Sequence, residues 1–466
     1  MRRSLIVAAV TAAPILASAV LPATANSAVR ASLGSDAVVT AVSCAPGGVC
    51  AAGGNYVDAS SREHAFVLTE RNGRWGAAIE VPGLAALSPK YASISSVSCA
   101  AGGCVAGGFY QNQAAGGSHA FVTSETNGRW SRLTRILTAG KSSRAGTDVS
   151  SLSCSGPRNC AAGGGRPAFV VSEVNGRWGR AHEFGAEGRF GTAKVSCASA
   201  GNCSAGWNTF VVSERNGRWG KPMALPGLSA LGTGAGITSL SCTAPGNCAV
   251  GGTYRSRSGT EVFVARKRHG RWRKAIEIPG FTALNKAGGG ELAGVSCISA
   301  GNCVAGGSYA VPADFAGGAF APFVASERNG RWGKAIEVPG IPPATSTLCE
   351  PDTASCVSGQ VLSVSCAPGG ICAAGGSYDT PAISGWVAFV VTYKDGHWTK
   401  VTQIPGLAAL DTAKVSGVNS VSCTPTGKCA GGGSYLSTSP QVGRPAFVVD
   451  ENNGTWGQAH TVSFRS

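Results

Sequence analysis

The sequence predicts an all-β protein assembled from eight copies of one unit. One stretch, FVASERNGRWGKAIEVPG from Phe323 to Gly340, recurs eight times, and a close pair of cysteines precedes every copy. Each copy also carries a tryptophan at the same place: Trp75, Trp130, Trp178, Trp219, Trp272, Trp332, Trp398 and Trp456. Sequence repetition at this scale predicts an architecture of stacked units, and it leaves the biochemical function open.

The recurring stretch has the pattern of a β-hairpin. Its first arm is rich in β-branched and aromatic residues, Asn329-Gly330 supplies a tight turn, and the second arm alternates up to Pro339-Gly340. A period of two would place Trp332, Ile336 and Val338 on one face of that arm. We interpret the repeated tryptophan as a wedge between adjacent units, in preference to a sugar-stacking platform.

A second hairpin begins each unit, as in Gly236–Cys242 followed by a short turn and Cys248–Tyr254. The cysteines would staple its two arms. Sixteen of the eighteen cysteines form eight such pairs and the other two a ninth: Cys44 with Cys50, Cys99 with Cys104, Cys154 with Cys160, Cys197 with Cys203, Cys242 with Cys248, Cys297 with Cys303, Cys366 with Cys372, Cys423 with Cys429, and Cys349 with Cys356.

An even cysteine count and local pairing in an exported chain favour disulfides over metal ligands or nucleophiles. Zinc sites usually have tighter cysteine spacing and often add histidine, whereas the six histidines keep no fixed relation to these cysteines. In the chain-entropy model each short loop contributes roughly 2 kcal/mol.

Two hairpins give four strands per unit, named a to d, and four-stranded units at this period are typical of propeller blades. The prediction is a single closed β-propeller of eight blades, each with a stapled a–b hairpin. Because the first and last blades supply all their own strands, the ring should close without exchanging a strand. A signal peptide at 1–25 and a linker at 26–37 would precede the propeller at 38–466, with blades at about 38–83, 93–138, 149–185, 193–227, 237–280, 292–340, 361–406 and 417–464.

A glycine doublet ends strand b in most blades, as at Gly53-Gly54 and Gly251-Gly252, and a tyrosine such as Tyr56 or Tyr254 follows it. Together with the tryptophan that opens strand d, these residues make each blade resemble a kelch repeat. The resemblance covers nearly all of the chain after the signal. It implies a β-propeller and no particular activity.

The N-terminus predicts export. Arg2-Arg3, an apolar run from Leu5 to Leu21, and small residues up to Ala25 are typical of a secretory signal peptide. No other span is long enough to cross a membrane, so we expect a secreted, extracellular protein. We also expect it to be a monomer. The net charge of +15 falls to about +13 with loss of the signal, which makes anionic polymers possible contacts.

Two faces are expected, because a–b and c–d turns lie on one face of a propeller and b–c and d–a connections on the other. The second face varies: blades three and four have almost no b–c loop, which should leave a notch. The connection from Gly340 to Val361 is the longest between blades and holds Cys349 and Cys356. Function is often found on such loops, although a tolerated insertion is the simpler interpretation.

Arginines recur at the c–d turns and would circle one rim: Arg71, Arg74, Arg129, Arg177, Arg215, Arg218, Arg268, Arg271, Arg328 and Arg331, with Lys394 in the seventh blade. They could dock teichoic acids, acidic polysaccharide or nucleic acid by displacing counterions. The alternative is a solvated turn whose charge is neutralised by Glu70, Glu125, Glu173, Glu214 and Glu327.

No catalytic residue, metal site or cofactor is predicted. Asp58, Glu63, His64, Asp314 and Asp379 are the groups available on the variable face, without a recognisable partner at defined spacing, and glycosidases need two placed carboxylates. No nucleotide motif is present. The sequence therefore favours a secreted, non-catalytic binding or scaffold propeller contacting cell-wall glycan or an extracellular protein, with no specific nucleic acid; the alternative is a glycan-active enzyme on the variable face.

Overall fold

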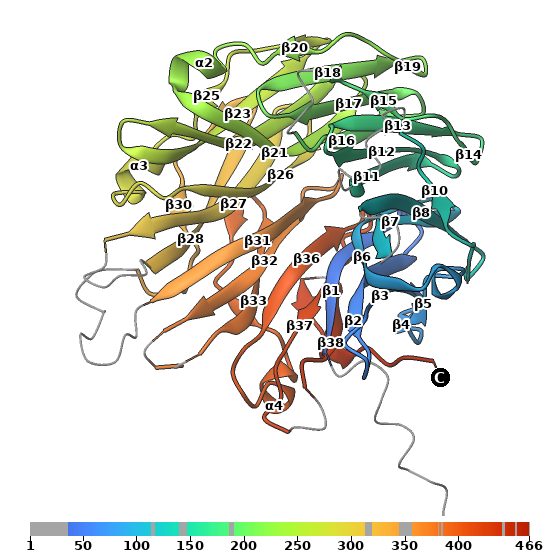
Figure 1. The fold of residues 1–466 in the computed structure, drawn as a ribbon. Coiled ribbons are helices and arrows are strands. Elements are labelled where there is room, and N and C mark those ends of the chain that lie inside the picture. Colours follow the sequence, from blue (N-terminus) through green and yellow to red (C-terminus); the bar gives the residue numbers. More distant parts are fainter. Residues whose placement is uncertain are drawn as a thin grey trace, which may run out of the picture.

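The computed structural model describes residues 36–112, 117–138, 147–185, 191–312, 319–343, 357–380, 382–383, 385–439, 443–452 and 454–465. Eight antiparallel sheets stand around a centre as the blades of one propeller (Figure 1), which confirms the predicted fold class and blade number. The predicted signal peptide, the Cys349–Cys356 pair and Asp314 lie outside the described residues.

Every blade contains strands a, b and c, followed by a strand d that is broken into two short pieces. In blades one to four these are β1 (Asp36–Cys44), β2 (Cys50–Val57), β3 (Glu63–Arg71), β4 (Arg74–Trp75) and β5 (Ile79–Glu80); β6 (Pro89–Ala100), β7 (Gly103–Asn112), β8 (Ser118–Thr126), β9 (Arg129–Trp130) and β10 (Thr134–Arg135); β11 (Asp148–Gly156), β12 (Asn159–Gly165), β13 (Phe169–Val174), β14 (Arg177–Trp178) and β15 (His182–Glu183); β16 (Lys194–Ser199), β17 (Asn202–Trp207), β18 (Phe210–Arg215), β19 (Arg218–Trp219) and β20 (Met223–Ala224).

The other four blades repeat this order. They contain β21 (Thr233–Ala244), β22 (Asn247–Ser256), β23 (Gly259–Arg268), β24 (Arg271–Trp272) and β25 (Ile276–Glu277); β26 (Glu291–Ser299), β27 (Asn302–Val311), β28 (Ala319–Arg328), β29 (Arg331–Trp332) and β30 (Ile336–Glu337); β31 (Ser358–Cys366), β32 (Cys372–Asp379), β33 (Val387–Lys394), β34 (His397–Trp398) and β35 (Thr402–Gln403); β36 (Gly417–Cys423), β37 (Cys429–Ser434), β38 (Ala446–Asn452), β39 (Thr455–Trp456) and β40 (His460–Thr461).

Among the elements that the structure describes in full, short helices follow strand d in four blades. They are η2 (Ala85–Leu87), α2 (Leu228–Leu231), α3 (Phe281–Leu284) and α4 (Leu407–Leu410). Each comes after a Pro-Gly pair, and an apolar side chain at its start, such as Leu228 or Phe281, is buried against the blade. Sequence analysis missed these helices, although Gly-Leu/Phe-x-Ala-Leu recurs in the sequence.

The interruption of strand d shows that one sequence prediction was wrong. Ile336 was expected to share the face of Trp332 and Val338, yet its side chain is 44% exposed, whereas Ala335 and Val338 are buried. The strand leaves its own blade between β29 and β30, where the N–H of Ala335 donates to Pro279 O of the preceding blade (2.8 Å). Strand d is therefore not one continuous strand from Trp332 to Val338, and strict alternation of side chains does not hold along it.

The glycine doublets fit a β-bulge in strand a. In blade one the register of β1 and β2 shifts between Val39 and Ala41, and a Cβ on the paired Gly54 would overlap the carbonyl oxygen of Val38. The preceding Gly53 faces Ile94 of the next blade. The matching pairing in blade four has no such shift, and there a bulky residue, Trp207, occupies the second position.

All eight a–b hairpins are closed by the predicted disulfides, and the structure describes no free cysteine. The paired cysteines face one another in register, for example Cys44 with Cys50, at a Cα–Cα distance of 4.0 Å. Such a bridge shortens the closed loop to a few residues and removes chain entropy from the unfolded state.

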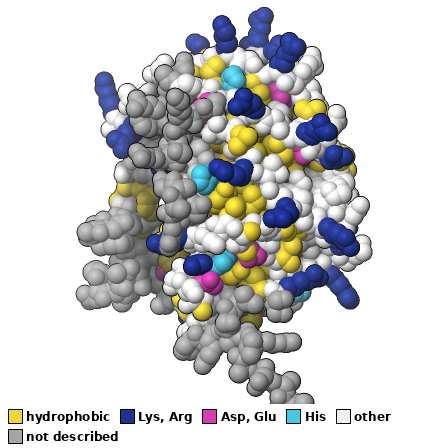
Figure 2. Space-filling view, turned by 45° about the vertical axis from the view of Figure 1, so that its right-hand side comes forward, with side chains coloured by type: hydrophobic (Ala, Val, Ile, Leu, Met, Phe, Trp, Pro, Cys, Tyr) yellow, Lys and Arg dark blue, Asp and Glu magenta, His cyan; other side chains and the backbone are white. Residues whose placement is uncertain are grey.

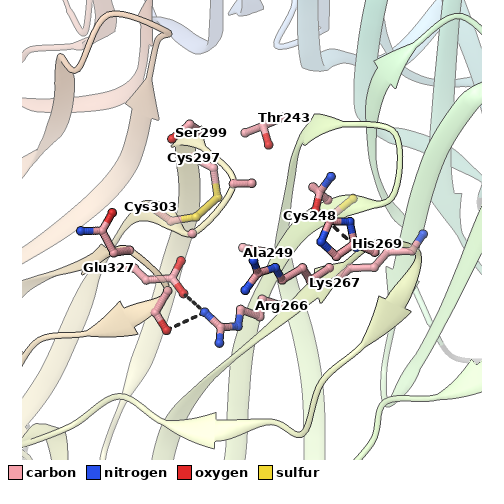
Figure 3. A pocket seen from close by; sticks show the side chains of 16 residues that line it. Thr243, Cys248, Ala249, Arg266, Lys267, His269, Cys297, Ser299, Cys303 and Glu327 are labelled. Carbon is pink, nitrogen blue, oxygen red and sulfur yellow. Dashed lines mark hydrogen bonds and ion pairs between the residues drawn. A yellow bond between two sulfur atoms is a disulfide. The ribbon is translucent and has the colours of Figure 1, made fainter.

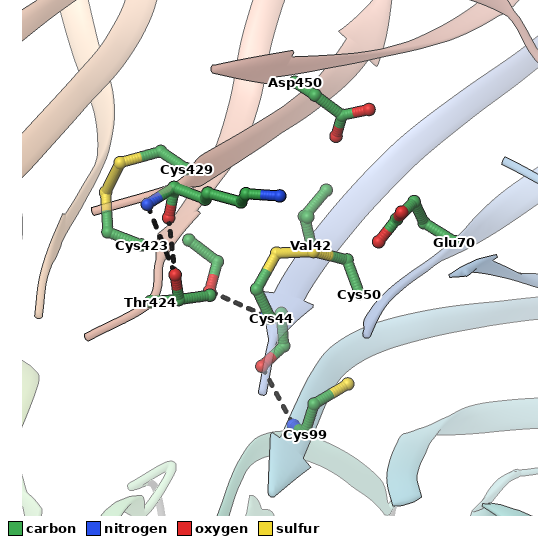
Figure 4. The surroundings of a disulfide bond; sticks show 12 residues. Val42, Cys44, Cys50, Glu70, Cys99, Cys423, Thr424, Cys429 and Asp450 are labelled. Carbon is green, nitrogen blue, oxygen red and sulfur yellow. Dashed lines mark hydrogen bonds between the residues drawn. A yellow bond between two sulfur atoms is a disulfide. The ribbon is translucent and has the colours of Figure 1, made fainter. Parts of the chain in front are cut away.

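A closed circle of hydrogen bonds joins the innermost strands. The serine that precedes the first cysteine of each blade accepts the N–H of the first cysteine of the next blade (Figure 4). The donor and acceptor pairs are Cys99 to Ser43, Cys154 to Ser98, Cys197 to Ser153, Cys242 to Ser196, Cys297 to Ser241, Cys366 to Ser296, Cys423 to Ser365 and Cys44 to Ser422, at 2.8 to 3.1 Å. We call this set the serine circle.

A second, incomplete set lies two residues earlier. Serines 96, 151, 239, 363 and 420 each accept a backbone N–H of the following blade at 2.9 to 3.1 Å. The other three blades carry Ala41, Lys194 and Gly294 at this position, and no such bond is found there among the described residues.

The outer parts of the blades are joined in the same direction. A backbone carbonyl after strand d, often that of the repeated proline, accepts an N–H from the next blade, as in Leu133 to Pro82 (3.0 Å) and Ala459 to Pro405 (2.9 Å). The ring closes by the same bond, because Ala78 N–H donates to Ser463 O (2.7 Å). Blade four has Pro222 at the donor position and therefore has no N–H to offer.

Candidate functional site

The a–b and c–d turns lie side by side on one face, which we call the turn face. The N–H of Gly217 in a c–d turn donates to Gly201 O of the adjacent a–b turn (2.9 Å), and Gly270 and Gly330 make the same bond in their blades. All ten arginines named from the sequence are exposed. Figure 2 shows many Lys and Arg side chains on the visible surface and few Asp and Glu.

The glutamates that could neutralise these arginines are instead buried. Relative exposure is 1% to 5% for six of them: Glu70, Glu125, Glu173, Glu214, Glu327 and Glu451. In blades one, two and eight the carboxylate folds back under its own turn and accepts the glycine N–H of Gly73, Gly128 or Gly454. In these three blades the acid therefore stabilises its own turn from below, and Glu125 also pairs with Arg71 of the preceding blade.

Several of these carboxyls are incompletely paired. One oxygen each of Glu125, Glu173, Glu214 and Glu327 is buried without a hydrogen-bond partner among the described residues. Burial raises the pKa of Glu173 above its ordinary value, and nearby Arg158 offsets this only in part. Burial also raises the pKa of Glu214, although a hydrogen bond from Ser172 lowers it in part. The fold thus favours the protonated form of Glu173 and of Glu214.

The structure divides the ten arginines into two groups. Arg71 donates to Glu125 of the next blade (2.6 Å), and Arg328 donates to Tyr393 Oη (3.0 Å), so these two hold blade seams. For the side chains of the other eight, no hydrogen bond or ion pair is found among the described residues. These free arginines are Arg74, Arg129, Arg177, Arg215, Arg218, Arg268, Arg271 and Arg331.

The repeated tryptophans lie at blade seams, which confirms their interpretation as wedges. The indole N–H of Trp130 donates to Thr69 Oγ1 of the preceding blade (3.1 Å), and that of Trp219 to Ser172 Oγ (3.0 Å). Trp75 donates to both oxygens of Asp450, which brings blade eight against blade one.

Blade five departs from this pattern, and sequence analysis missed it. Six of the other seven blades end strand c with a polar residue and a buried glutamate, and blade seven has Thr392 and Tyr393 there, whereas β23 has Arg266 and Lys267. Lys267 Nζ donates to Ser204 (3.1 Å) and Ser213 (2.5 Å) of blade four, and burial, with Arg215 nearby, lowers the pKa of Lys267 to about 8. The run RKRHGRWRK at 266–274, which contains no acidic residue, could have revealed this difference in the sequence.

Two cavities flank Arg266 at the seam between blades five and six. One, of about 410 Å³, opens among the turns and is lined by Asn247, Arg268 and His269 (Figure 3). The other, of about 350 Å³, lies toward the outer wall and is lined by Lys274 and Ile276. Arg266, Arg268, Glu327 and Gly330 line both.

The opposite face holds a separate cavity at the mouth of the ring. It measures about 490 Å³ and is lined by Lys194, Glu291 and Gln360 among others. Burial lowers the pKa of Lys194, although the charge of Asp148 nearby raises it. Blades three and four pass from b to c through short turns, since β17 ends at Trp207 and β18 begins at Phe210.

The structure brings together two of the acid–base candidates that sequence analysis left without partners. His64 lies between Asp58 Oδ2 (2.9 Å) and Glu80 Oε1 (3.2 Å), and its ring stacks on Tyr56. Asp58 also accepts the N–H groups of Ser60 and Arg62, so it organises the b–c loop. Although burial alone raises the pKa of Asp58, these bonds and His64 lower it.

Burial raises the pKa of the third candidate, Glu63, and Asp379 accepts the N–H of Gly385 (2.8 Å) within its loop. Among the described residues, no group of three or more His, Cys, Asp or Glu is arranged to hold a metal ion. Nor does the described part contain a helix with the length and hydropathy needed to span a bilayer.

No protein-family model and no curated protein sequence matches this chain. Solved structures do resemble it. Sqt1 from Chaetomium thermophilum is 13% identical (TM-score 0.48), with 86% of this chain and 94% of that one covered. YCF48 from Cyanidioschyzon merolae is 12% identical (TM-score 0.41; 78% and 97%), and an ulvan lyase of polysaccharide lyase family PL25 is 11% identical (TM-score 0.38; 89% and 90%). These likenesses concern the fold.

Proposed function

We propose that this chain is an exported, non-catalytic binding module whose turn face contacts anionic polymer of the cell wall. The observation that carries the proposal is the separation of charge: ten arginines are exposed on that face, whereas the glutamates of the same turns are buried. A polyanion that binds such a surface releases its condensed counterions into solution, so each contact with an arginine adds affinity.

Export rests on the signal-peptide pattern at residues 1–25. Eight disulfides are consistent with an oxidising extracellular compartment. The relation to kelch repeats stays a prediction, as does a monomeric state.

We do not propose the alternative, a glycan-active enzyme on the variable face. Glycoside hydrolysis needs one carboxyl to donate a proton and a second to act on the sugar or on water. Asp58 and Glu80 are close to each other only through His64, to which both are bound. Among the described residues of that face, no arrangement favours catalysis over a role in loop structure.

The test is cosedimentation of the purified mature protein with isolated Gram-positive cell wall across a salt series. A variant with Arg74, Arg129 and Arg177 changed to Gln is compared with a matched variant carrying Lys90→Gln, Arg257→Gln and Lys286→Gln, which are also exposed but lie outside the c–d turns. We expect wall binding to fall steeply with salt, and to fall about tenfold at moderate salt in the arginine variant alone.

Equal losses in the two variants would show that net charge, and not the turn face, governs binding. Salt-resistant binding that free sugars compete away would also overturn the proposal. If the protein does not sediment with cell wall at any salt concentration, the proposed function is wrong.

A further inference from the structure

We propose that the seam between blades five and six is the principal binding site, and that its ligand is a glycan bearing carboxylates, such as a polyuronate. This rests on the proposed function and names the place and ligand class within it. Blade five differs from the six blades that end strand c with a buried glutamate, because it has Lys267 at that position.

Replacement of the usual buried glutamate removes an acid and adds cations at one blade. Lys267 is not free to contact a ligand, because it is only 5% exposed and its ammonium group donates to Ser204 and Ser213 of blade four. The remaining cations of the run are Arg266, Arg268, Arg271, Arg273 and Lys274, and the last four are exposed. No other blade concentrates so much positive charge in its c–d region.

Among these cations, Arg266 is held in a fixed position across the seam. Its Nη1 donates to Gly330 O (2.5 Å) and lies 3.4 Å from Glu327 Oε1, so the guanidinium is fixed across the seam. Its side chain stays 36% exposed and lines both cavities. A guanidinium held in place can present its other N–H groups to a planar carboxylate with little loss of entropy.

The residues that line the two cavities favour a carboxylated sugar polymer over a polyol phosphate chain. The cavity among the turns offers Asn247, Asn329 and Ser299, whose amide and hydroxyl groups suit sugar hydroxyls. The outer cavity adds Ile276, which is 45% exposed, and half-buried Trp332. A sugar ring can cover this apolar surface while its carboxylate meets Arg268 or Lys274, whereas a polyol phosphate chain would leave the surface wet.

The experiment measures binding of the disulfide-intact mature protein to oligogalacturonate by calorimetry. Neutral galacto-oligosaccharide of equal length and poly(glycerol phosphate) serve as comparison ligands. The variant R268Q/K274Q is paired with R74Q/R129Q, which removes the same charge from blades one and two. A third variant, Ile276→Ser, removes the apolar contact without changing charge.

We expect oligogalacturonate to bind and the neutral oligomer not to bind. R268Q/K274Q should weaken the binding about tenfold or more and R74Q/R129Q less than about threefold. Ile276→Ser should weaken oligogalacturonate about threefold to fivefold and leave poly(glycerol phosphate) unchanged. Unaltered circular dichroism and unfolding midpoints would show that the variants are folded.

Equal losses in the two charge variants would overturn the assignment to blades five and six while leaving the rim proposal standing. Tighter binding of poly(glycerol phosphate), with no effect of Ile276→Ser on oligogalacturonate, would overturn the ligand class. Absence of oligogalacturonate binding alongside salt-dependent wall binding would overturn this inference alone, whereas absence of both would remove the function on which it rests.

Discussion

The serine circle should contribute measurably to the cohesion of the ring, and the seam between blades one and two allows a two-way test. Ser43→Ala removes the acceptor of the Cys99 N–H, a 2.9 Å bond to a residue that is 8% exposed. On the same strand, Ala41 occupies the position where five other blades have a bonding serine. Ala41→Ser should therefore supply an acceptor for the N–H of Val97.

A buried donor left without its partner costs about 1 to 3 kcal/mol. Ser43 is only half-buried, so water in the centre of the ring can replace part of the bond, and we expect the lower half of that range. A loss of about 1 to 2 kcal/mol corresponds to an increase of about fivefold to thirtyfold in the opening equilibrium of this seam. Ala41→Ser should change the equilibrium in the opposite direction by about 1 kcal/mol or less.

Hydrogen exchange followed by mass spectrometry on peptides from β6 measures this directly, because Cys99 and Val97 both lie on that strand. Urea unfolding gives the global counterpart. We expect faster exchange in Ser43→Ala and slower exchange in Ala41→Ser, with strands of blades four and five unchanged as an internal control. If Ser43→Ala leaves both the β6 exchange and the urea midpoint at wild-type values, the circle does not stabilise the ring.

Three further predictions follow from the seams and turns. Trp219→Phe, which deletes the bond to Ser172, should lower the free energy of unfolding by about 1 kcal/mol, whereas Trp178→Phe should be near neutral because that indole N–H has no partner among the described residues; a urea series on both would show it. Because burial raises the pKa of Glu173, the folded chain holds a proton that the unfolded chain has lost, so stability falls as pH rises above about 4.5; Glu173→Gln should be the more stable form at pH 7 and flatten this slope, and an unchanged slope in thermal unfolding from pH 4 to 7 would contradict it. Gly54→Ala should destabilise blade one by about 1 to 3 kcal/mol because its Cβ would overlap Val38 O, while Gly76→Ala, 3.3 Å from Thr69 O, should cost less than about 1 kcal/mol in the same assay.

The sequence predicted those features that depend on local repetition. A few neighbouring residues are enough to specify each strand c, such as the one that contains Phe66. The same holds for each Asn-Gly turn, such as Asn329-Gly330, and for each close cysteine pair. The eight blades and their disulfides could therefore be predicted from the sequence. The closure of the ring without strand exchange was predicted for the same reason.

Side-chain direction between blades was not accessible. The charge of Glu173 was expected to neutralise exposed arginines, but strand c turns that position inward and buries it. Partners such as His64 and Glu80, which are 16 positions apart in the sequence, come together only when strands c and d pair. The serine before each first cysteine was visible eight times, yet its role depends on how adjacent blades are spaced, which no single repeat specifies.

The bond that closes the ring, from Ala78 N–H to Ser463 O, joins the same two positions of the repeat as the bond from Leu133 N–H to Pro82 O between blades one and two. The N–H of Ala37 likewise donates to Arg444 O (2.6 Å), so the first strand begins against blade eight. The two ends of the described region thus meet at a junction of the same construction as the others, and this region is circular in its contacts although linear in its covalent structure. Circular permutants that join these ends and open the chain between any other two blades should keep the same arrangement of arginines, cavities and seams.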